Sequence, residues 1–119
     1  MRAWIPAQPE YLTSLQSSAQ FACEVGFAVT PEWSESWDET DPEVLEAQML
    51  ADAGQHSRLV IVGECQGLVT NAQSGQIQIT SPIIKANVYA IFAANAADSQ
   101  DFLWFGPSEL PEALAWHSS

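Results

Sequence analysis

The order of apolar and polar residues predicts strands and helices in alternation over the first half of the chain. Residues 3–5 are apolar and end at Pro6, which is typical of a short first strand. Pro9 suits the first turn of a helix, and apolar side chains recur after it at helical spacing, at Tyr11, Leu12, Leu15 and Ala19. The apolar run at residues 26–29 then predicts a second, buried strand.

Two helix starts follow, and both carry the same signal. The sequences TPE at residues 30–32 and DPE at residues 41–43 each supply an N-cap side chain, a proline for the first turn and a carboxylate beside the helix dipole. Trp33 and Trp37 are four residues apart, so we expect them to share one face of the first, short helix. The second helix is longer, and Gly54 is expected to end it.

From Arg58 onward the pattern becomes that of strands. Residues 59–62 are continuously apolar and rich in β-branched side chains, which indicates a central strand covered on both faces. Residues 75–80 alternate strictly, so Ile77 and Ile79 should point inward from a half-exposed strand. Two further strands and a last short helix are expected at residues 87–92, 101–105 and 108–116.

The chain of 119 residues is predicted to form a single domain over residues 1–119. Apolar residues make up 47% of it, which is enough for a hydrophobic core without disulfides or metals. Helices dominate the first part and strands the second. This order predicts an α+β fold, with a mixed, largely antiparallel sheet of five to six strands and two or three helices packed on one face.

The charge is strongly one-sided, with 15 acidic against 3 basic residues and a net charge of −12. No Lys or Arg occurs between Arg2 and Arg58. Within that gap seven carboxylates crowd into residues 32–46, at Glu32, Glu35, Asp38, Glu39, Asp41, Glu43 and Glu46. We call residues 32–46 the acidic segment. Such a surface repels phosphate backbones and anionic membranes, which disfavours direct binding to nucleic acid or to a membrane.

Two interpretations of the acidic segment stay open. The charge can simply keep a small protein soluble and monomeric, with both tryptophans in the core. Alternatively, aromatic side chains ringed by charge form an interface for a basic protein partner, in the narrowest case a nucleic-acid-binding protein whose basic groove the segment would occupy. The leading hypothesis is this second one, a non-catalytic binding or regulatory module. Its predicted partner-binding residues are Trp33, Glu35, Trp37, Asp38, Glu39, Asp41, Glu43 and Glu46.

Candidate chemistry is sparse. The chain has no nucleophile elbow, no phosphate-binding loop with lysine and no dinucleotide fingerprint, so we predict no catalytic residue and no cofactor. Residues 38–43 lack the ligand spacing and central glycine of a calcium loop, and no specific metal site is expected. Two alternatives remain: a small-ligand binder or enzyme with a carboxylate-lined pocket between sheet and helices near Cys65 or His56, or an interface on the apolar tail at residues 102–116.

Targeting features are also lacking. No apolar run is long enough for a signal peptide or a membrane span, which favours a cytoplasmic protein. Cys23 and Cys65 could pair, but inert, reduced thiols are the expected state in that compartment. The sequence does not fix the oligomeric state.

Several short motifs resemble a known family. They are MRAWIPA at residues 1–7, FAVTP at 27–31, and LWF at 103–105 followed by SEL at 108–110. Together they resemble a family of small acidic actinobacterial proteins of unknown function, over nearly the full length of the chain. The region 93–100 looks shorter than in that family. The resemblance implies an ordinary cytoplasmic bacterial domain, and it transfers no catalytic residue.

Overall fold

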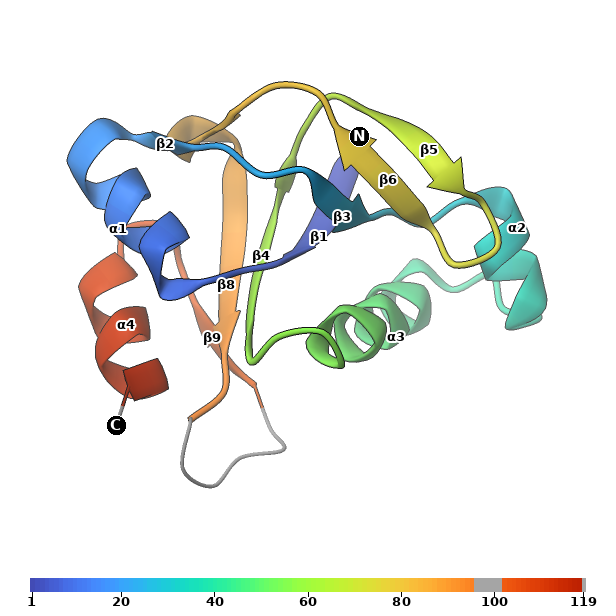
Figure 1. The fold of residues 1–119 in the computed structure, drawn as a ribbon. Coiled ribbons are helices and arrows are strands. Elements are labelled where there is room, and N and C mark those ends of the chain that lie inside the picture. Colours follow the sequence, from blue (N-terminus) through green and yellow to red (C-terminus); the bar gives the residue numbers. More distant parts are fainter. Residues whose placement is uncertain (96–101, 119) are drawn as a thin grey trace.

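The computed structural model describes residues 1–95 and 102–118. Within those residues the chain forms an α+β fold, as predicted, around an antiparallel sheet in the strand order β5-β6-β3-β1-β4-β8-β9 (Figure 1). In chain order these strands are β1 (Arg2–Pro6), β3 (Val25–Phe27), β4 (Leu59–Glu64), β5 (Gly67–Asn71), β6 (Gln76–Ile79), β8 (Val88–Ala93) and β9 (Leu103–Phe105). Two shorter strands, β2 (Gln20–Phe21) and β7 (Ile83–Ile84), pair in a second small sheet.

The large sheet differs from the prediction in size and in strand direction. Seven strands form it within the described residues, against the five to six expected, and every pairing among them is antiparallel rather than mixed. The additional strand is β5, which follows β4 after a short connection but lies beside β6, with three strands between it and β4 in the sheet order. The expected last strand is observed as β9, and Asp101 of its predicted range lies outside the described residues.

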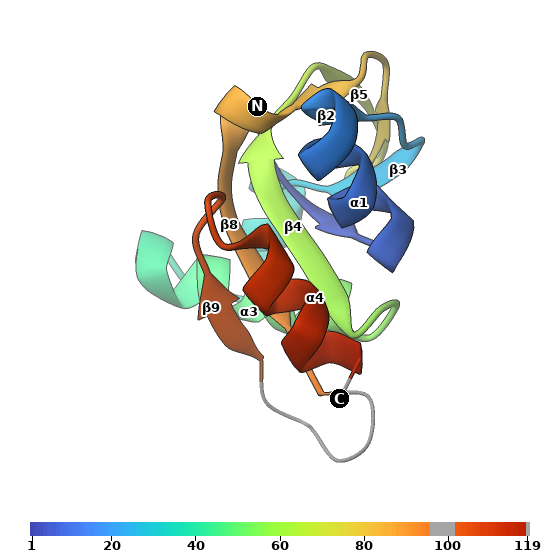
Figure 2. The same cartoon turned by 90° about the vertical axis from the view of Figure 1, so that its left-hand side faces the viewer.

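Helices cover both faces of the sheet, so the prediction of a single covered face is wrong. The helices α1 (Pro9–Ser18) and α4 (Leu110–Ser118) lie on one face, whereas α2 (Pro31–Ser36) and α3 (Pro42–Gly54) lie on the other. Figure 2 shows α1 and α4 in front of β4 and α3 behind it. The physical reason is that β4 is buried on both sides, and apolar side chains on both faces of a strand need a layer on each.

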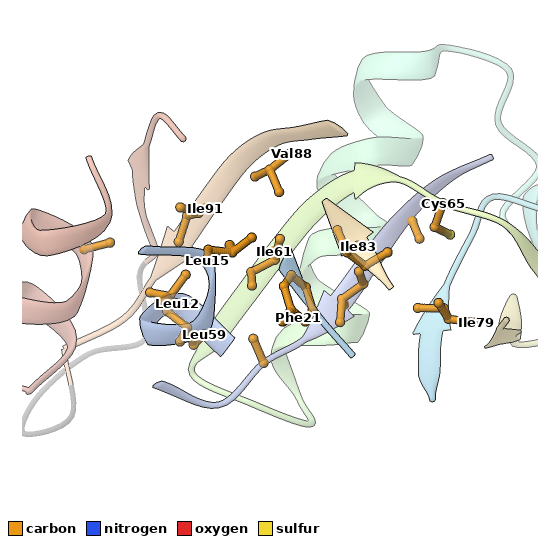
Figure 3. Close-up of a cluster of buried hydrophobic side chains, with 14 of the residues drawn as sticks. Leu12, Leu15, Phe21, Leu59, Ile61, Cys65, Ile79, Ile83, Val88 and Ile91 are labelled. Carbon is orange, nitrogen blue, oxygen red and sulfur yellow. The ribbon is translucent and has the colours of Figure 1, made fainter. Parts of the chain in front are cut away.

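Alternation along the central strands divides the core into two clusters. Ile5, Leu59 and Ile61 point toward α1 and α4, where Leu12 and Phe21 pack against them (Figure 3). The intervening residues of the same strands point the other way and meet α2 and α3: Trp4, Val60 and Val62. Side chains on a strand alternate between the faces, so one apolar run supplies both clusters.

The turn between β5 and β6 is fastened to the start of α2. The amide of Ala28 donates to the carbonyl oxygen of Gly75 at 2.8 Å, and the Thr30 hydroxyl donates to the carbonyl oxygen of Ala72 at 2.5 Å. Gly75 has φ +78°, and a Cβ at this position would collide with the carbonyl oxygen of Ala28. Glycine is therefore required where the turn approaches the strand that leads into α2.

No helix among the described residues has both the length and the apolar character that crossing a bilayer requires.

Candidate partner-binding site

Both helix starts of the acidic segment form as predicted. The Thr30 hydroxyl oxygen accepts a hydrogen bond from the amide of Trp33 at 3.1 Å, and Pro31 opens α2. At α3 the Asp41 carboxylate accepts from the amide of Glu43 at 3.0 Å. These N-caps satisfy amides that have no partner within their helices. The two caps therefore set the first residues of α2 and α3, the helices that contain most of the acidic segment.

Trp33, one of the predicted partner-binding residues, is almost wholly buried. Its side chain is 2% exposed and packs in the cluster between the sheet and α3. Its indole N–H donates to the Asp52 carboxylate at 3.1 Å. The reason is geometric: the face of α2 that carries Trp33 is turned toward α3.

Trp37, by contrast, lies at the surface. It is 47% exposed and forms the C-cap of α2, just past the last helical residue. Asp38 follows with φ +49°, which turns the chain away from the helix axis. The two indole rings are still neighbours, with centroids 6.2 Å apart and planes inclined at 57°. Trp37 thus lies over the buried ring of Trp33 and leaves about half of its own surface to solvent.

The seven carboxylates of the acidic segment divide into two groups. Three have partners: Glu39 accepts from the amides of residues 40 and 41, Asp41 caps α3, and Glu46 pairs with Arg2 at 3.3 Å. The other four are exposed and have no hydrogen bond or ion pair through their carboxylates with the described part of the chain: Glu32, Glu35, Asp38 and Glu43. Arg2 is also engaged above the ring of Tyr89, at 4.7 Å.

A hollow of about 440 Å³ opens beside Trp37, and we call it the Trp37 hollow. Its walls come from four separate parts of the chain, one of them Phe27 on β3. They include Trp33 and Trp37 of the acidic segment, Asp52 and His56 at the end of α3, and Gln73 and Ser74 in the β5–β6 turn. In the described part of the chain, no Lys or Arg side chain lines it.

A second hollow, of about 690 Å³, lies next to the first. The ring of His56 stacks on Phe27, with centroids 5.2 Å apart and planes at 17°, and this pair lines both hollows. The second hollow also exposes Tyr11, Cys23 and Glu24. This position beside His56 agrees with part of the alternative hypothesis, which expects a carboxylate-lined pocket near Cys65 or His56. Cys65 is instead buried in the core cluster, on the side of Ile79 and Ile83 (Figure 3).

The second hollow offers weak nucleophiles. Burial, with a smaller effect from nearby Cys65, raises the pKa of Cys23 to about 11, so its thiol stays protonated at neutral pH. Burial likewise raises the pKa of Tyr11. Glu24 is exposed rather than buried, whereas a carboxylate used for acid–base chemistry needs burial to tune it. Among the described residues no group of three or more His, Cys, Asp or Glu side chains could hold a metal ion.

Residues 1–101 match the family of unknown function DUF6912. The chain belongs to this family. The resemblance to a family of unknown function is therefore confirmed at that level, and no activity comes with it. The DUF6912 match contains every residue that lines the Trp37 hollow, whereas β9 and α4 lie beyond its end. No curated protein and no solved structure is significantly similar to the chain.

Sequence reasoning missed the parts of the site in this DUF6912 member that lie outside the acidic segment. Asp52 is 19 positions from Trp33, whose indole it binds, and Gln73 comes from a turn between strands. The one local signal is the spacing of Gln48 and Asp52, four apart on α3, whose side chains are hydrogen-bonded at 3.2 Å. Nothing in the sequence pattern places Asp52 and Trp37 in the lining of one hollow.

The apolar tail also exposes aromatic surface. Trp104 on β9 is 60% exposed and lines a separate hollow of about 490 Å³ with Arg2 and Tyr89. The charged side chains that border this hollow, Arg2 and Glu46 of the acidic segment, pair with each other, so the hollow lacks uncompensated charge. It provides the comparison surface for any test of the candidate site.

Proposed function

We propose that this protein is a non-catalytic binding or regulatory module that uses the exposed part of its acidic segment to bind a basic protein partner. One observation carries the proposal: Trp37, 47% exposed, borders a hollow and is close in sequence to exposed carboxylates, Glu35 and Asp38, that form no ion pair with the described part of the chain. An exposed tryptophan beside a hollow is the type of residue that dominates binding energy at interfaces.

The surrounding charge supports the choice of a basic partner. Glu32 and Glu35 on α2, and Asp38 next to Trp37, are exposed and unpaired among the described residues. Such groups attract a cationic surface over the range of the Debye length and raise the rate of encounter. The indole then supplies contact area once the charges have met.

The setting we propose is the bacterial cytoplasm. Cys23 and Cys65 are free thiols, which suits a reducing compartment. In its narrowest form the partner is a nucleic-acid-binding protein, because such proteins present basic grooves that a run of carboxylates complements.

The proposal is tested by titrating the protein with a basic peptide and measuring binding by tryptophan fluorescence and by calorimetry. The probe is a soluble peptide containing equal numbers of Arg and Lys. We expect binding that weakens as ionic strength rises from about 0.01 M to about 0.15 M, since the Debye length falls from about 30 Å to about 8 Å. Trp37→Ala should weaken binding about tenfold, which corresponds to about 1.4 kcal/mol.

The matched control is Trp104→Ala, which removes an indole from the comparison surface. It should leave the affinity unchanged. Absence of binding at low salt, or a loss confined to Trp104→Ala, would contradict the proposed function.

A further inference from the structure

Asp52 differs from the other carboxylates near Trp37. Two hydrogen bonds hold its carboxylate group in one orientation, but none of the described residues forms an ion pair with it. One carboxylate oxygen accepts from the Trp33 indole N–H at 3.1 Å, and the other accepts from the Gln48 side-chain amide at 3.2 Å. Both donors are neutral. Asp52 is half-buried and forms no ion pair with any residue that the structure describes.

Each of these oxygens can accept a second hydrogen bond. A carboxylate has about four acceptor positions, and the two internal donors occupy two of them. Asp52 lines the Trp37 hollow, where water or a ligand can reach the remaining positions. A half-buried anion held in this way is poised for a cationic donor, since a hydrogen bond between charged groups is roughly twice as strong as a neutral one.

The walls of the hollow favour a planar cation. Trp37 presents an exposed indole on one side, and His56 stacked on Phe27 adds a second aromatic surface. Gln73 and Ser74 complete the lining with uncharged polar groups. A guanidinium group both stacks on aromatic rings and donates two parallel hydrogen bonds to a carboxylate, whereas an ammonium group acts as a compact point charge.

We propose that the Trp37 hollow is an arginine subsite, in which the guanidinium of an arginine from the protein partner stacks on Trp37 and donates to Asp52. This inference rests on the proposed function and names the residue type that the same surface selects. The charge of the surroundings argues for a protein segment rather than a free small molecule. Exposed carboxylates lie on α2, at Glu32 and Glu35, and directly after Trp37, at Asp38, where they can meet other basic residues of the same segment.

Two peptides of equal length and charge, one containing only Arg and the other only Lys as cations, test this subsite. We expect the Arg peptide to bind about tenfold more tightly, a difference of about 1.4 kcal/mol. Asp52→Asn should abolish most of that preference. Its side-chain oxygen can still accept from the Trp33 indole, so the fold is retained. Trp37→Leu, a change at a half-exposed position, provides an independent second variant that should also reduce the preference.

The matched charge control is Glu112→Gln on α4, which removes one exposed carboxylate outside the acidic segment. It should leave the ratio between the two peptides unchanged. Equal affinities for the two peptides, or a preference that survives Asp52→Asn, would overturn the arginine subsite while the proposed function stands. Failure of both peptides to bind would overturn both. Free arginine amide that binds as tightly as the Arg peptide would show a small-molecule site and overturn the assignment to a protein segment.

Discussion

Trp33 on α2 and Trp37, the C-cap of the same helix, lie in opposite environments. Trp33 is enclosed between the sheet and α3, whereas Trp37 follows the last residue of α2 and stays about half exposed. Their spacing predicts that they are neighbours, and the rings are indeed 6.2 Å apart. The depth of each ring could not be predicted, because it depends on Asp52 and α3, which follow later in the chain.

Cys23 should make stability depend on pH in the alkaline range. Burial raises its pKa from 9.0 to about 11, so above pH 9 the folded state keeps a proton that the unfolded chain has lost. The free energy of unfolding should therefore fall as the pH rises from about 9 to about 11. Urea unfolding across this range checks the prediction.

The control for this experiment is Cys23→Ala. Burial also raises the pKa values of Tyr11 and Cys65, so the variant should still lose stability at high pH, but less than the natural protein. An identical pH dependence of the two proteins would contradict the assignment to Cys23.

At the scale of elements, local chemistry predicted how helices begin better than how strands pair. Thr30 and Asp41 act as the N-caps that the sequence indicated, and α3 ends at Gly54 as expected. The strands β2 and β7, two residues each, and β5 were missed. A strand of two residues carries no periodicity of its own and exists through its partner.

The two caps should contribute unequally to stability. Thr30→Ala removes the hydroxyl that accepts from Trp33 and donates to the carbonyl oxygen of Ala72, at a buried position. We expect a loss of about 2 kcal/mol in the free energy of unfolding, against about 1 kcal/mol for Asp41→Ala at the exposed start of α3. Urea unfolding measures both.

The control is Thr40→Ala, an exposed position next to Asp41. It should change the free energy of unfolding by less than about 0.5 kcal/mol. Equal losses for Thr30→Ala and Asp41→Ala would show that the hydrogen bond from the Thr30 hydroxyl to the β5–β6 turn does not contribute to stability.

For the whole molecule, the sequence predicted the fold class but not the arrangement of its layers. The run at residues 59–62 indicated a strand covered on both sides, as observed, yet helices were predicted on only one face of the sheet. The strand order could not be predicted, because β1 pairs with β4 and β3 with β6, and the strands of each pair are far apart in the chain (Figure 1). Pairing of this kind leaves no mark in a local pattern.

The candidate site, like the strand order, could be predicted from the sequence only in part. Trp37 and the exposed carboxylates could be named from the sequence, since they lie in one continuous segment. The hollow could not, because β3, the end of α3 and the β5–β6 turn meet only in the folded protein. Asp52, the residue that gives the hollow its charge, is therefore the one that sequence reasoning had no means to select.

Chemical-shift mapping with the Arg peptide tests the central claim most directly, because it locates the bound surface residue by residue. The account predicts shifts of the Trp37 indole N–H and of amides at residues 35–41, 52–56 and 73–74, with the Trp104 indole unchanged. Shifts concentrated on β9 and α4, with the Trp37 indole unmoved, would contradict it.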